Sequence, residues 1–268
     1  MKNHLTPFSS SHPLTRMISS SSAGTESALD SLAKRMTSDS YVVFLTGAGV
    51  SAESGVPTFR SSDGLWKKFK PEELANFNAF IKNPVLVQSW YRHRTEIVEN
   101  VKPNKGHFAM AEIESKVDKF AVITQNVDNL HQRAGCEEVI ELHGNIFRSY
   151  CIDCKEQFDV QLFSENGEPI ICRCGGLVRP DVVWFGEMLP IDAFRLAEKH
   201  ARKCDLFISV GTSGVVYPAA GLSSLAKSSG AFLAEINTEP TELSSIMDVT
   251  FQGKSGEILP ELISLLES

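Results

Sequence analysis

One glycine-rich run directly follows an apolar segment in this chain. Residues 41–46 read Tyr-Val-Val-Phe-Leu-Thr and predict a buried strand, and Gly47 and Gly49 follow it at once. Glycines at these positions allow a tight turn and let the backbone approach a pyrophosphate closely. Ala52 is small enough for close packing at the position where dinucleotide-binding turns carry Gly or Ala. The run therefore predicts a strand that leads into a nucleotide-phosphate turn.

The segment after the turn departs from an ordinary dinucleotide-binding unit. Such a unit runs straight into a helix, whereas Gly55 and Pro57 interrupt this one. A loop then continues through Phe59 and Arg60 to Trp66. We expect this loop to form a flap over a cofactor.

The rest of the chain alternates between strand-like and helical patterns. Strand-like runs lie at residues 42–45, 120–123, 139–142, 206–210 and 232–236, and helical patterns at 27–36, 84–98, 107–115, 191–203, 218–227 and 258–266. This alternation predicts an α/β fold, a Rossmann-like parallel sheet with helices on both faces, formed by residues 26–64, 104–147 and 179–268. Residues 65–103, which are mainly helical, and 148–178, which carry cysteines, predict a smaller helical and zinc-binding domain.

Composition limits the partners and the location of the protein. The net charge of -7 argues against direct binding to nucleic acid, and no apolar run reaches the length of a membrane span. Residues 1–25 are rich in serine and have no acidic side chain, so they predict a disordered tail. The same composition suits a mitochondrial transit peptide. We favour a cytoplasmic protein, with the mitochondrial matrix as the alternative.

Four of the six cysteines have the spacing of a zinc site. Cys151 and Cys154 are separated by two residues, and Cys172 and Cys174 by one. Four thiolates predict one tetrahedral structural zinc with no open position for water, and the alternative is a disulfide pair or reactive thiols. Cys136 and Cys204 lie next to apolar runs and are expected in the core.

Three polar residues at strand ends are candidates for catalysis. His143 follows the predicted strand 139–142, at the kind of position where open sheets place ligands, and can be either a structural hydrogen-bonding residue or a base. Asn126 and Asp128 follow the strand 120–123. They can cap a helix near residues 129–133, line a pocket, or do both.

Several motifs taken together resemble the sirtuin family of NAD-dependent protein-lysine deacylases. The resemblance runs in order from about residue 30 to the C-terminus, through the segments 47–60, 124–131, 142–145, 210–213 and 235–239. It implies that NAD is the co-substrate and that acylated-lysine proteins are the partners. The products would be free lysine, nicotinamide and 2′-O-acyl-ADP-ribose.

The resemblance also implies roles for individual residues. His143 is the expected general base for a ribose hydroxyl, with Asn126 and Asp128 as the other catalytic residues, and Phe59 would shield the reactive carbon from water. Arg60 is either a solvated loop cation or a partner of the pyrophosphate. The expected NAD-binding residues are Gly47, Ala48, Gly49, Ala52, Glu53, Thr58, Phe59, Arg60, Trp66, Gln125, Asn126, Val127, Asp128, Gly211, Thr212, Ser213, Asn237, Thr238, Glu239 and Ser255.

Two extended apolar segments are expected to hold the protein substrate. Residues 182–187, with Val183, Trp184 and Phe185, and residues 213–217 could offer backbone hydrogen bonds to an added peptide strand. A buried strand would have a similar sequence.

A Tyr-x-x-Arg pair predicts which acyl groups are removed. Tyr91 and Arg94 are three residues apart in a helical segment, so their side chains share one face. They can be an ordinary aromatic and arginine pair of an amphipathic helix. The pair also resembles the signature of sirtuins that remove succinyl and malonyl groups, because Arg94 could bind the acyl carboxylate and Tyr91 could donate a hydroxyl proton. The alternative is a simple deacetylase without acidic-acyl preference.

Two other classes of protein remain to be weighed. A nicotinamide dehydrogenase is disfavoured by the predicted flap and by the missing strand with an acidic residue about 20 residues past the glycines. A zinc-ribbon binding module would need a basic face. Residues 148–181 instead hold four basic and six acidic side chains: Arg148, Lys155, Arg173 and Arg179 against Asp153, Glu156, Asp159, Glu165, Glu168 and Asp181.

Overall fold

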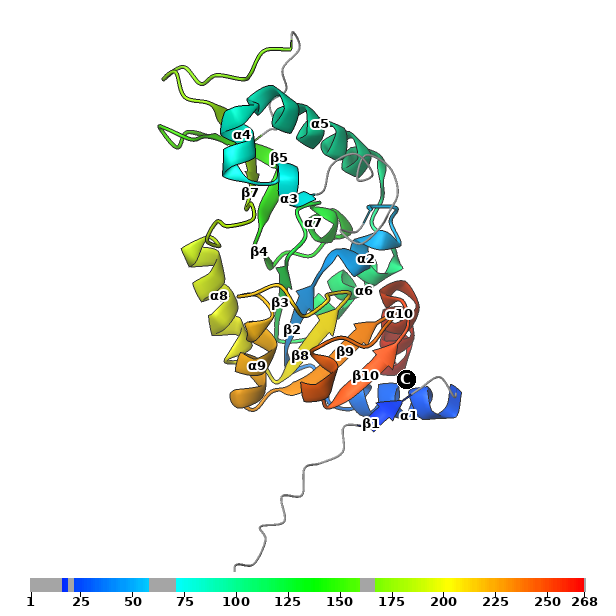
Figure 1. Cartoon of the computed structure of the whole chain (residues 1–268). Helices are drawn as coiled ribbons and strands as arrows, with labels where there is room; N and C mark the ends of the chain where they lie inside the picture. Colours follow the sequence, from blue (N-terminus) through cyan, green and yellow to red (C-terminus); the bar gives the residue numbers. More distant parts are fainter. Residues whose placement is uncertain (1–15, 19–21, 58–70, 160–166, 268) are drawn as a thin grey trace, which may run out of the picture.

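A parallel sheet of seven strands, in the order β1-β10-β9-β8-β2-β3-β4, forms the centre of the larger domain in the computed structural model (Figure 1). The structure describes residues 16–18, 22–57, 71–159 and 167–267. The strands are β1 Arg16–Ile18, β2 Tyr41–Thr46, β3 Lys119–Thr124, β4 Val139–Glu141, β8 Leu206–Val210, β9 Phe232–Asn237 and β10 Val249–Gln252. All five predicted strands are present, and β1 and β10 are additional.

Helices cover both faces of this sheet because successive strand residues point to opposite sides. Val42 and Phe44 pack against one set of helices, and Val43 and Leu45 against the other. The first set is α1 Ser22–Ala33, α6 Lys105–Glu114 and α10 Ser255–Leu266, and the second is α8 Ile191–Ala201 and α9 Gly221–Ser228. The predicted Rossmann-like α/β arrangement is confirmed.

The strand order changes direction at β2. The chain continues from β2 to β3 and β4 on one side, whereas β8, β9 and β10 follow on the other. In open α/β sheets a ligand crevice forms at the carboxyl ends of the two strands that flank such a point. Here the short helix α2 Ala48–Ala52 follows β2, and α7 Leu130–Ala134 follows β3 after a loop.

The smaller domain combines three helices with an antiparallel sheet. The helices are α3 Pro71–Leu74, α4 Phe77–Lys82 and α5 Pro84–Asn100, and the sheet order is β6-β5-β7, with β6 Gln157–Phe158, β5 Gly144–Cys151 and β7 Val178–Val182. Asn83 caps α5 because its side chain accepts a hydrogen bond from the Leu86 amide. Phe80, Trp90, Tyr91 and Trp184 form the core of this domain.

The N-terminal part of the fold begins earlier than the sequence indicated. Strand β1 pairs in parallel with β10, and α1 begins at Ser22, so both lie partly inside the span 1–25 that was expected to be a disordered tail. Residues 1–15 and 19–21 lie outside the described residues. Along the described chain, we find no helix with both the length and the apolar character needed to cross a membrane. A short 3₁₀ helix, η2 Ser244–Ile246, precedes β10.

Candidate active site

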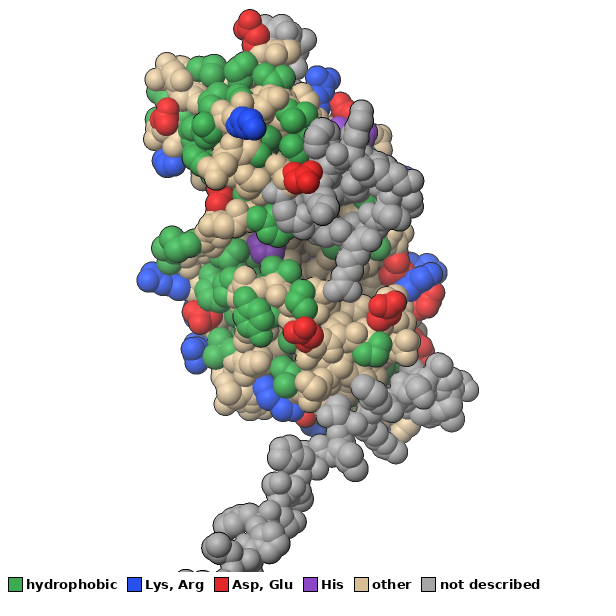
Figure 2. All heavy atoms as spheres, viewed as in Figure 1, with side chains coloured by type: hydrophobic (Ala, Val, Ile, Leu, Met, Phe, Trp, Pro, Cys, Tyr) green, Lys and Arg blue, Asp and Glu red, His purple; other side chains and the backbone are tan. Residues whose placement is uncertain are grey.

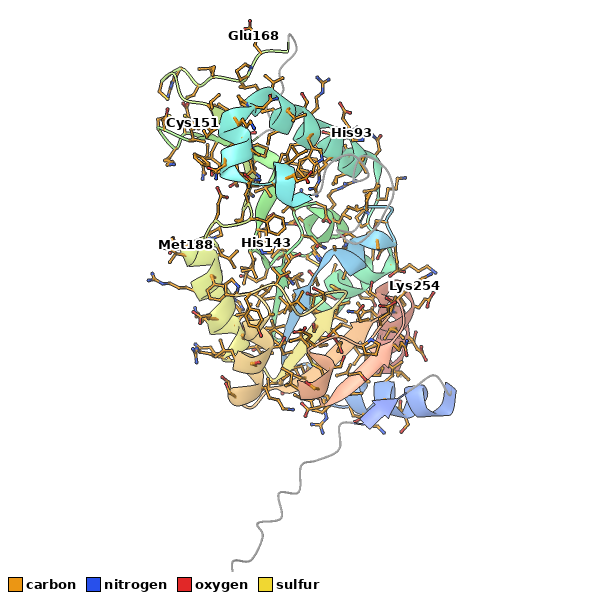
Figure 3. All side chains as sticks on the ribbon, viewed as in Figure 1. His93, His143, Cys151, Glu168, Met188 and Lys254 are labelled. Carbon is orange, nitrogen blue, oxygen red and sulfur yellow. The ribbon has the colours of Figure 1, made fainter. Side chains whose placement is uncertain are left out.

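His143 lies between the two domains, in the short connection between β4 Val139–Glu141 and β5 Gly144–Cys151 (Figure 3). Its Nδ1 atom is 2.9 Å from the Gln125 carbonyl oxygen, so Nδ1 donates and the lone pair of the neutral ring is on Nε2. Burial lowers the pKa of His143, although the carbonyl contact opposes the change. The imidazole is therefore neutral near pH 7 and can accept a proton at Nε2.

Gly144 allows β5 and β7 of the smaller domain to approach each other closely, directly beside His143. Its φ is +79°, and a Cβ atom there would lie 2.1 Å from the Asp181 carbonyl oxygen. Only glycine allows this approach between β5 and β7. The backbone conformation directly after His143 is therefore tightly restricted.

The loop after β3 turns its polar side chains toward the glycine-rich turn. Gln125 Nε2 donates to Thr212 Oγ1 at 2.8 Å. Asn126 Nδ2 donates to the Gly47 carbonyl at 3.0 Å and to Ser51 Oγ at 3.1 Å. The carboxyl ends of β2, β3 and β8 therefore meet through side-chain contacts of Gln125 and Asn126.

Asp128 is buried and accepts two hydrogen bonds. Ser51 Oγ donates to its Oδ2 at 2.6 Å, and the Leu130 amide donates to its Oδ1 at 3.0 Å. Desolvation raises the pKa of the Asp128 carboxyl, and these two bonds oppose the rise. The expected helix-capping role is present, since Asp128 binds the first amide of α7, and the N-cap residue Asn129 adopts φ +60° without a side-chain cap.

Ser51 is a site residue that the sequence analysis missed. Its hydroxyl contacts both Asn126 and Asp128, and the side chain is buried. A hydroxyl two residues after the second glycine of a nucleotide turn is the signal that could have found it.

The glycine-rich turn is shaped by contact with another loop. A Cβ atom on Gly47 would lie 2.8 Å from Thr212 Cα, and one on Gly49 would lie 2.7 Å from Gly211 Cα. Gly211 itself has φ +60°, and its Cβ would lie 2.5 Å from the Val50 amide nitrogen. These glycines are required where the turns after β2 and β8 touch.

Two predicted details of this turn need correction or completion. Ala52 is exposed, so its small size does not serve close helix packing, and the buried residue at this place is Ser51. Glu53 Oε1 accepts from Ser255 Oγ at 2.9 Å and from the Gly256 amide at 3.0 Å. Glu53 therefore stabilises the N-terminus of α10 as well as lying at the site.

The remaining expected cofactor residues follow β8 and β9. Asn237 Nδ2 donates to the Thr212 carbonyl at 2.8 Å, which joins the two loops. Thr238 and Glu239 are exposed at the end of β9, and Ser213 is half-buried after β8. Thr58, Phe59, Arg60 and Trp66 lie outside the described residues.

Tyr91 and Arg94 share one face of α5, and Arg94 interacts electrostatically with Asp128 of the loop after β3. The Arg94 guanidinium is 4.8 Å from the Trp90 ring centroid and 5.8 Å from that of Tyr91. Burial lowers the pKa of the Arg94 guanidinium, and the charges of Tyr91 and Asp128 oppose this change. Arg94 is half-buried, and Tyr91 is fully buried with its hydroxyl 2.8 Å from Trp184 Nε1.

The segment that contains Val183, Trp184 and Phe185 is a turn rather than an extended strand. β7 ends at Val182, and the Glu187 amide donates to the Trp184 carbonyl at 3.0 Å. The Val183 amide donates to the His143 carbonyl and the Phe185 amide to the Ala75 carbonyl. These two amides are already paired, so the expected backbone strand addition is not available at them.

Exposed apolar side chains border the site. Phe185 is 53% exposed, Met188 84% and Tyr217 74%. Figure 2 shows a hollow between the domains with a histidine inside it and hydrophobic side chains around it, and Figure 3 labels His143 and Met188 in this region.

The four predicted zinc ligands come together in the smaller domain. The sulfur atoms of Cys151, Cys154, Cys172 and Cys174 all lie within 4.8 Å of one another. A Cβ atom on Gly176 would lie 2.7 Å from the Cys151 sulfur, so the hairpin must carry glycine there. The thiolate set fits a tetrahedral zinc. Cys136 and Cys204 are buried in the core as predicted, and burial raises the pKa of each thiol to about 12.

Comparisons with known proteins agree with this geometry. The model of the Sir2 family matches residues 47–218. The NAD-dependent protein deacylase 2 of Pyrobaculum aerophilum is 50% identical over 232 residues, which cover 87% of this chain and 93% of the relative. A solved Sir2 homolog–NAD complex is 46% identical with a TM-score of 0.83, covering 89% of this chain and 93% of the other. A Sir2–p53 peptide–NAD⁺ structure is 33% identical with a TM-score of 0.78, covering 87% and 96%.

Proposed function

This chain belongs to the Sir2 family of NAD-dependent protein deacylases, and we propose that the acyl groups it removes from lysine include succinyl and malonyl as well as acetyl. Its substrates are proteins that carry acylated lysine, in line with the relative solved with a peptide and NAD⁺. Membership of this family also decides against the hydride-transferring dehydrogenase.

The proposed acyl preference is carried by the position of Arg94. A carboxylate at the end of an acyl chain needs a charged partner once it enters an apolar tunnel. Arg94 is half-buried, stacks on Trp90, and lies close enough to Asp128 for the two charges to interact. It is therefore a cation of the smaller domain whose charge interacts with the loop that carries Asp128.

Tyr91 supports the same preference through its hydroxyl. Burial raises the pKa of Tyr91, so the hydroxyl stays protonated. It accepts a hydrogen bond from Trp184 Nε1, which leaves its own proton for another acceptor. An acyl carboxylate can be that acceptor.

The catalytic residues have separate tasks in this proposal. NAD, when bound, would supply the ADP-ribosyl group that finally carries the acyl group, with nicotinamide as the leaving group. His143 accepts the proton of a ribose hydroxyl at Nε2, because Nδ1 is held by the Gln125 carbonyl. Asn126 and Asp128, joined through Ser51, hold the loop beneath the nicotinamide side of the pocket.

The zinc has a structural task. Four cysteines complete a tetrahedral coordination and leave no position for a reacting water. The cluster also lies in the smaller domain, at a distance along the molecule from His143 (Figure 3).

A comparison of acyl substrates tests the proposal. The values of kcat/KM for succinyl-, malonyl- and acetyl-lysine versions of one peptide should show that the acidic groups are removed at least as well as acetyl. Activity on the acetyl peptide alone would make the enzyme a simple deacetylase.

A further inference from the structure

Two buried histidines lie beneath the cofactor loops and take no part in the proposed reaction. His107 on α6 and His131 on α7 are 0% and 1% exposed, and their ring centroids are 4.9 Å apart. Each ring has one buried nitrogen, His107 Nε2 and His131 Nδ1, without a hydrogen-bond partner among the described residues. Unpaired buried polar atoms are rare and call for a physical account.

The other nitrogen of each ring shows where the protons are. His107 Nδ1 accepts from the Asn104 amide at 3.3 Å, so the neutral ring carries its proton on Nε2. Thr46 Oγ1 donates its only proton to Thr124 Oγ1 at 2.9 Å. His131 Nε2, 2.9 Å from Thr46 Oγ1, must therefore be the donor, which leaves a lone pair on Nδ1.

The two unpaired atoms are thus a donor and an acceptor on neighbouring rings. We propose that His107 Nε2–H donates to His131 Nδ1. In this proposal the pair positions the catalytic loop, residues 125–129, against the glycine-rich turn for NAD binding. The ring centroids, 4.9 Å apart, are close enough for a direct bond between one nitrogen of each ring. Burial lowers the pKa of both histidines, so both rings are neutral near pH 7, as the pairing requires.

The pair completes a continuous chain of hydrogen bonds through the interior. From His131 the chain passes to Thr46 and Thr124, and Thr124 Oγ1 accepts from the Asn126 amide at 3.0 Å. From His107 it passes to Asn104. The chain therefore connects the α6 cap with the backbone of the catalytic loop.

Both ends of this chain bind the turn after β2. Asn104 Nδ2 donates to the Val50 carbonyl at 2.7 Å and to Ser54 Oγ at 3.0 Å. Asn126 Nδ2 donates to the Gly47 carbonyl. The histidine pair is then the internal link that keeps these NAD-facing segments in register, an inference that rests on the proposed function because it takes NAD as the ligand.

The protonation pattern can be measured without ligand or substrate. Long-range ¹H–¹⁵N correlation spectra of the full chain with ¹⁵N-labelled histidine should show His107 and His131 as neutral Nε2–H tautomers, with a coupling between His107 Nε2 and His131 Nδ1 across the hydrogen bond. An Nδ1–H tautomer on either ring, or the absence of that coupling, would overturn the pairing.

Kinetics test the positioning role with acetyl peptide and NAD. His131→Leu should raise KM for NAD by about tenfold while kcat changes by less than about threefold, because the chemistry is intact and the loops are less well held. His131→Gln should recover most of the loss, since its amide can donate to Thr46 and accept from His107.

A matched control separates this role from a general loss of stability. His200→Leu removes another histidine, which lies on α8 and pairs with Tyr41 of β2, and it should leave KM for NAD unchanged. Equal changes in KM for His131→Leu and His200→Leu, or a Gln variant as impaired as Leu, would refute the positioning role. Because these measurements use the acetyl peptide, they stand whether or not acidic acyl groups are removed.

Discussion

The indole Nε1 of Trp184 donates a 2.8 Å hydrogen bond to the Tyr91 hydroxyl, and it joins the turn after β7 to helix α5. Trp184 is itself held by Arg179, whose guanidinium lies 3.3 Å from the centre of its ring, and by Glu187, which accepts from its amide at 2.8 Å. The direction of the Tyr91 hydroxyl is therefore set by residues of β7 and of the turn that follows it.

Trp184→Phe should reduce the preference for acidic acyl groups. The substitution keeps an aromatic ring but removes the N–H group, so the Tyr91 hydroxyl is no longer directed toward the acyl chain. We expect kcat/KM for the succinyl peptide to fall about fivefold to tenfold relative to that for the acetyl peptide, the scale of one hydrogen bond. Tyr91→Phe should have a similar effect, and the double variant should add little to either single one. Additive losses would show that the two side chains act independently.

Arg94→Met should remove most of the acidic-acyl activity. The loss of a desolvated charge partner is expected to cost roughly 2–5 kcal/mol in succinyl selectivity, whereas turnover of the acetyl peptide should change much less. Arg92→Met is a matched control on the same helix, because Arg92 is exposed and pairs with Glu96 at 3.1 Å. If Arg94→Met lowers kcat/KM equally for both peptides, Arg94 supports the fold and the enzyme is a deacetylase.

The sequence was sufficient for much of the fold because the central strands are long and mostly apolar. Strands β2, β3, β8 and β9 each have five or six residues with almost no exposed position. Strand β10 has only four residues, and β1 has three that pair with it. Such short segments are stabilised by their neighbours more than by their own pattern, so periodicity alone does not reveal them.

The site was predicted through its motifs, but not the contacts that assemble it. The four cysteines come together as predicted, whereas the catalytic roles of His143 and Asn126 stay predictions. The Ser51–Asp128 bond joins residues 77 positions apart, and the Glu53–Ser255 bond joins residues 202 apart. Contacts over such distances depend on the strand order, which one sequence does not specify. The acyl preference and the cellular location stay predictions.

Cys151→Ala should release zinc and destabilise the smaller domain. Removing one of four thiolates weakens the site, and metal binding is coupled to folding in such sites. We expect a zinc content well below one ion per chain and a lower Tm. Cys204→Ala is the control, because its thiol is buried in the core of the larger domain and is not part of the four-cysteine cluster. A zinc-free Cys151→Ala protein with unchanged Tm and activity would contradict a structural role.

The pH dependence of the reaction should reveal the environment of His143. A general base must be neutral, and burial lowers the pKa of this imidazole below its ordinary value of 6.5. As pH falls, the base is therefore protonated only below that value, so the acid limb of kcat/KM should lie under pH 6.5.

His143→Ala should lower turnover by about 10²–10⁴-fold and abolish this limb, while NAD affinity changes little, because a base is lost and the other cofactor contacts remain. Asp128→Asn tests whether the acid limb comes instead from the buried Asp128 carboxyl, whose pKa is raised. A limb that persists unchanged in His143→Ala, or turnover within a few-fold of the unmodified enzyme, would show that another group is the base.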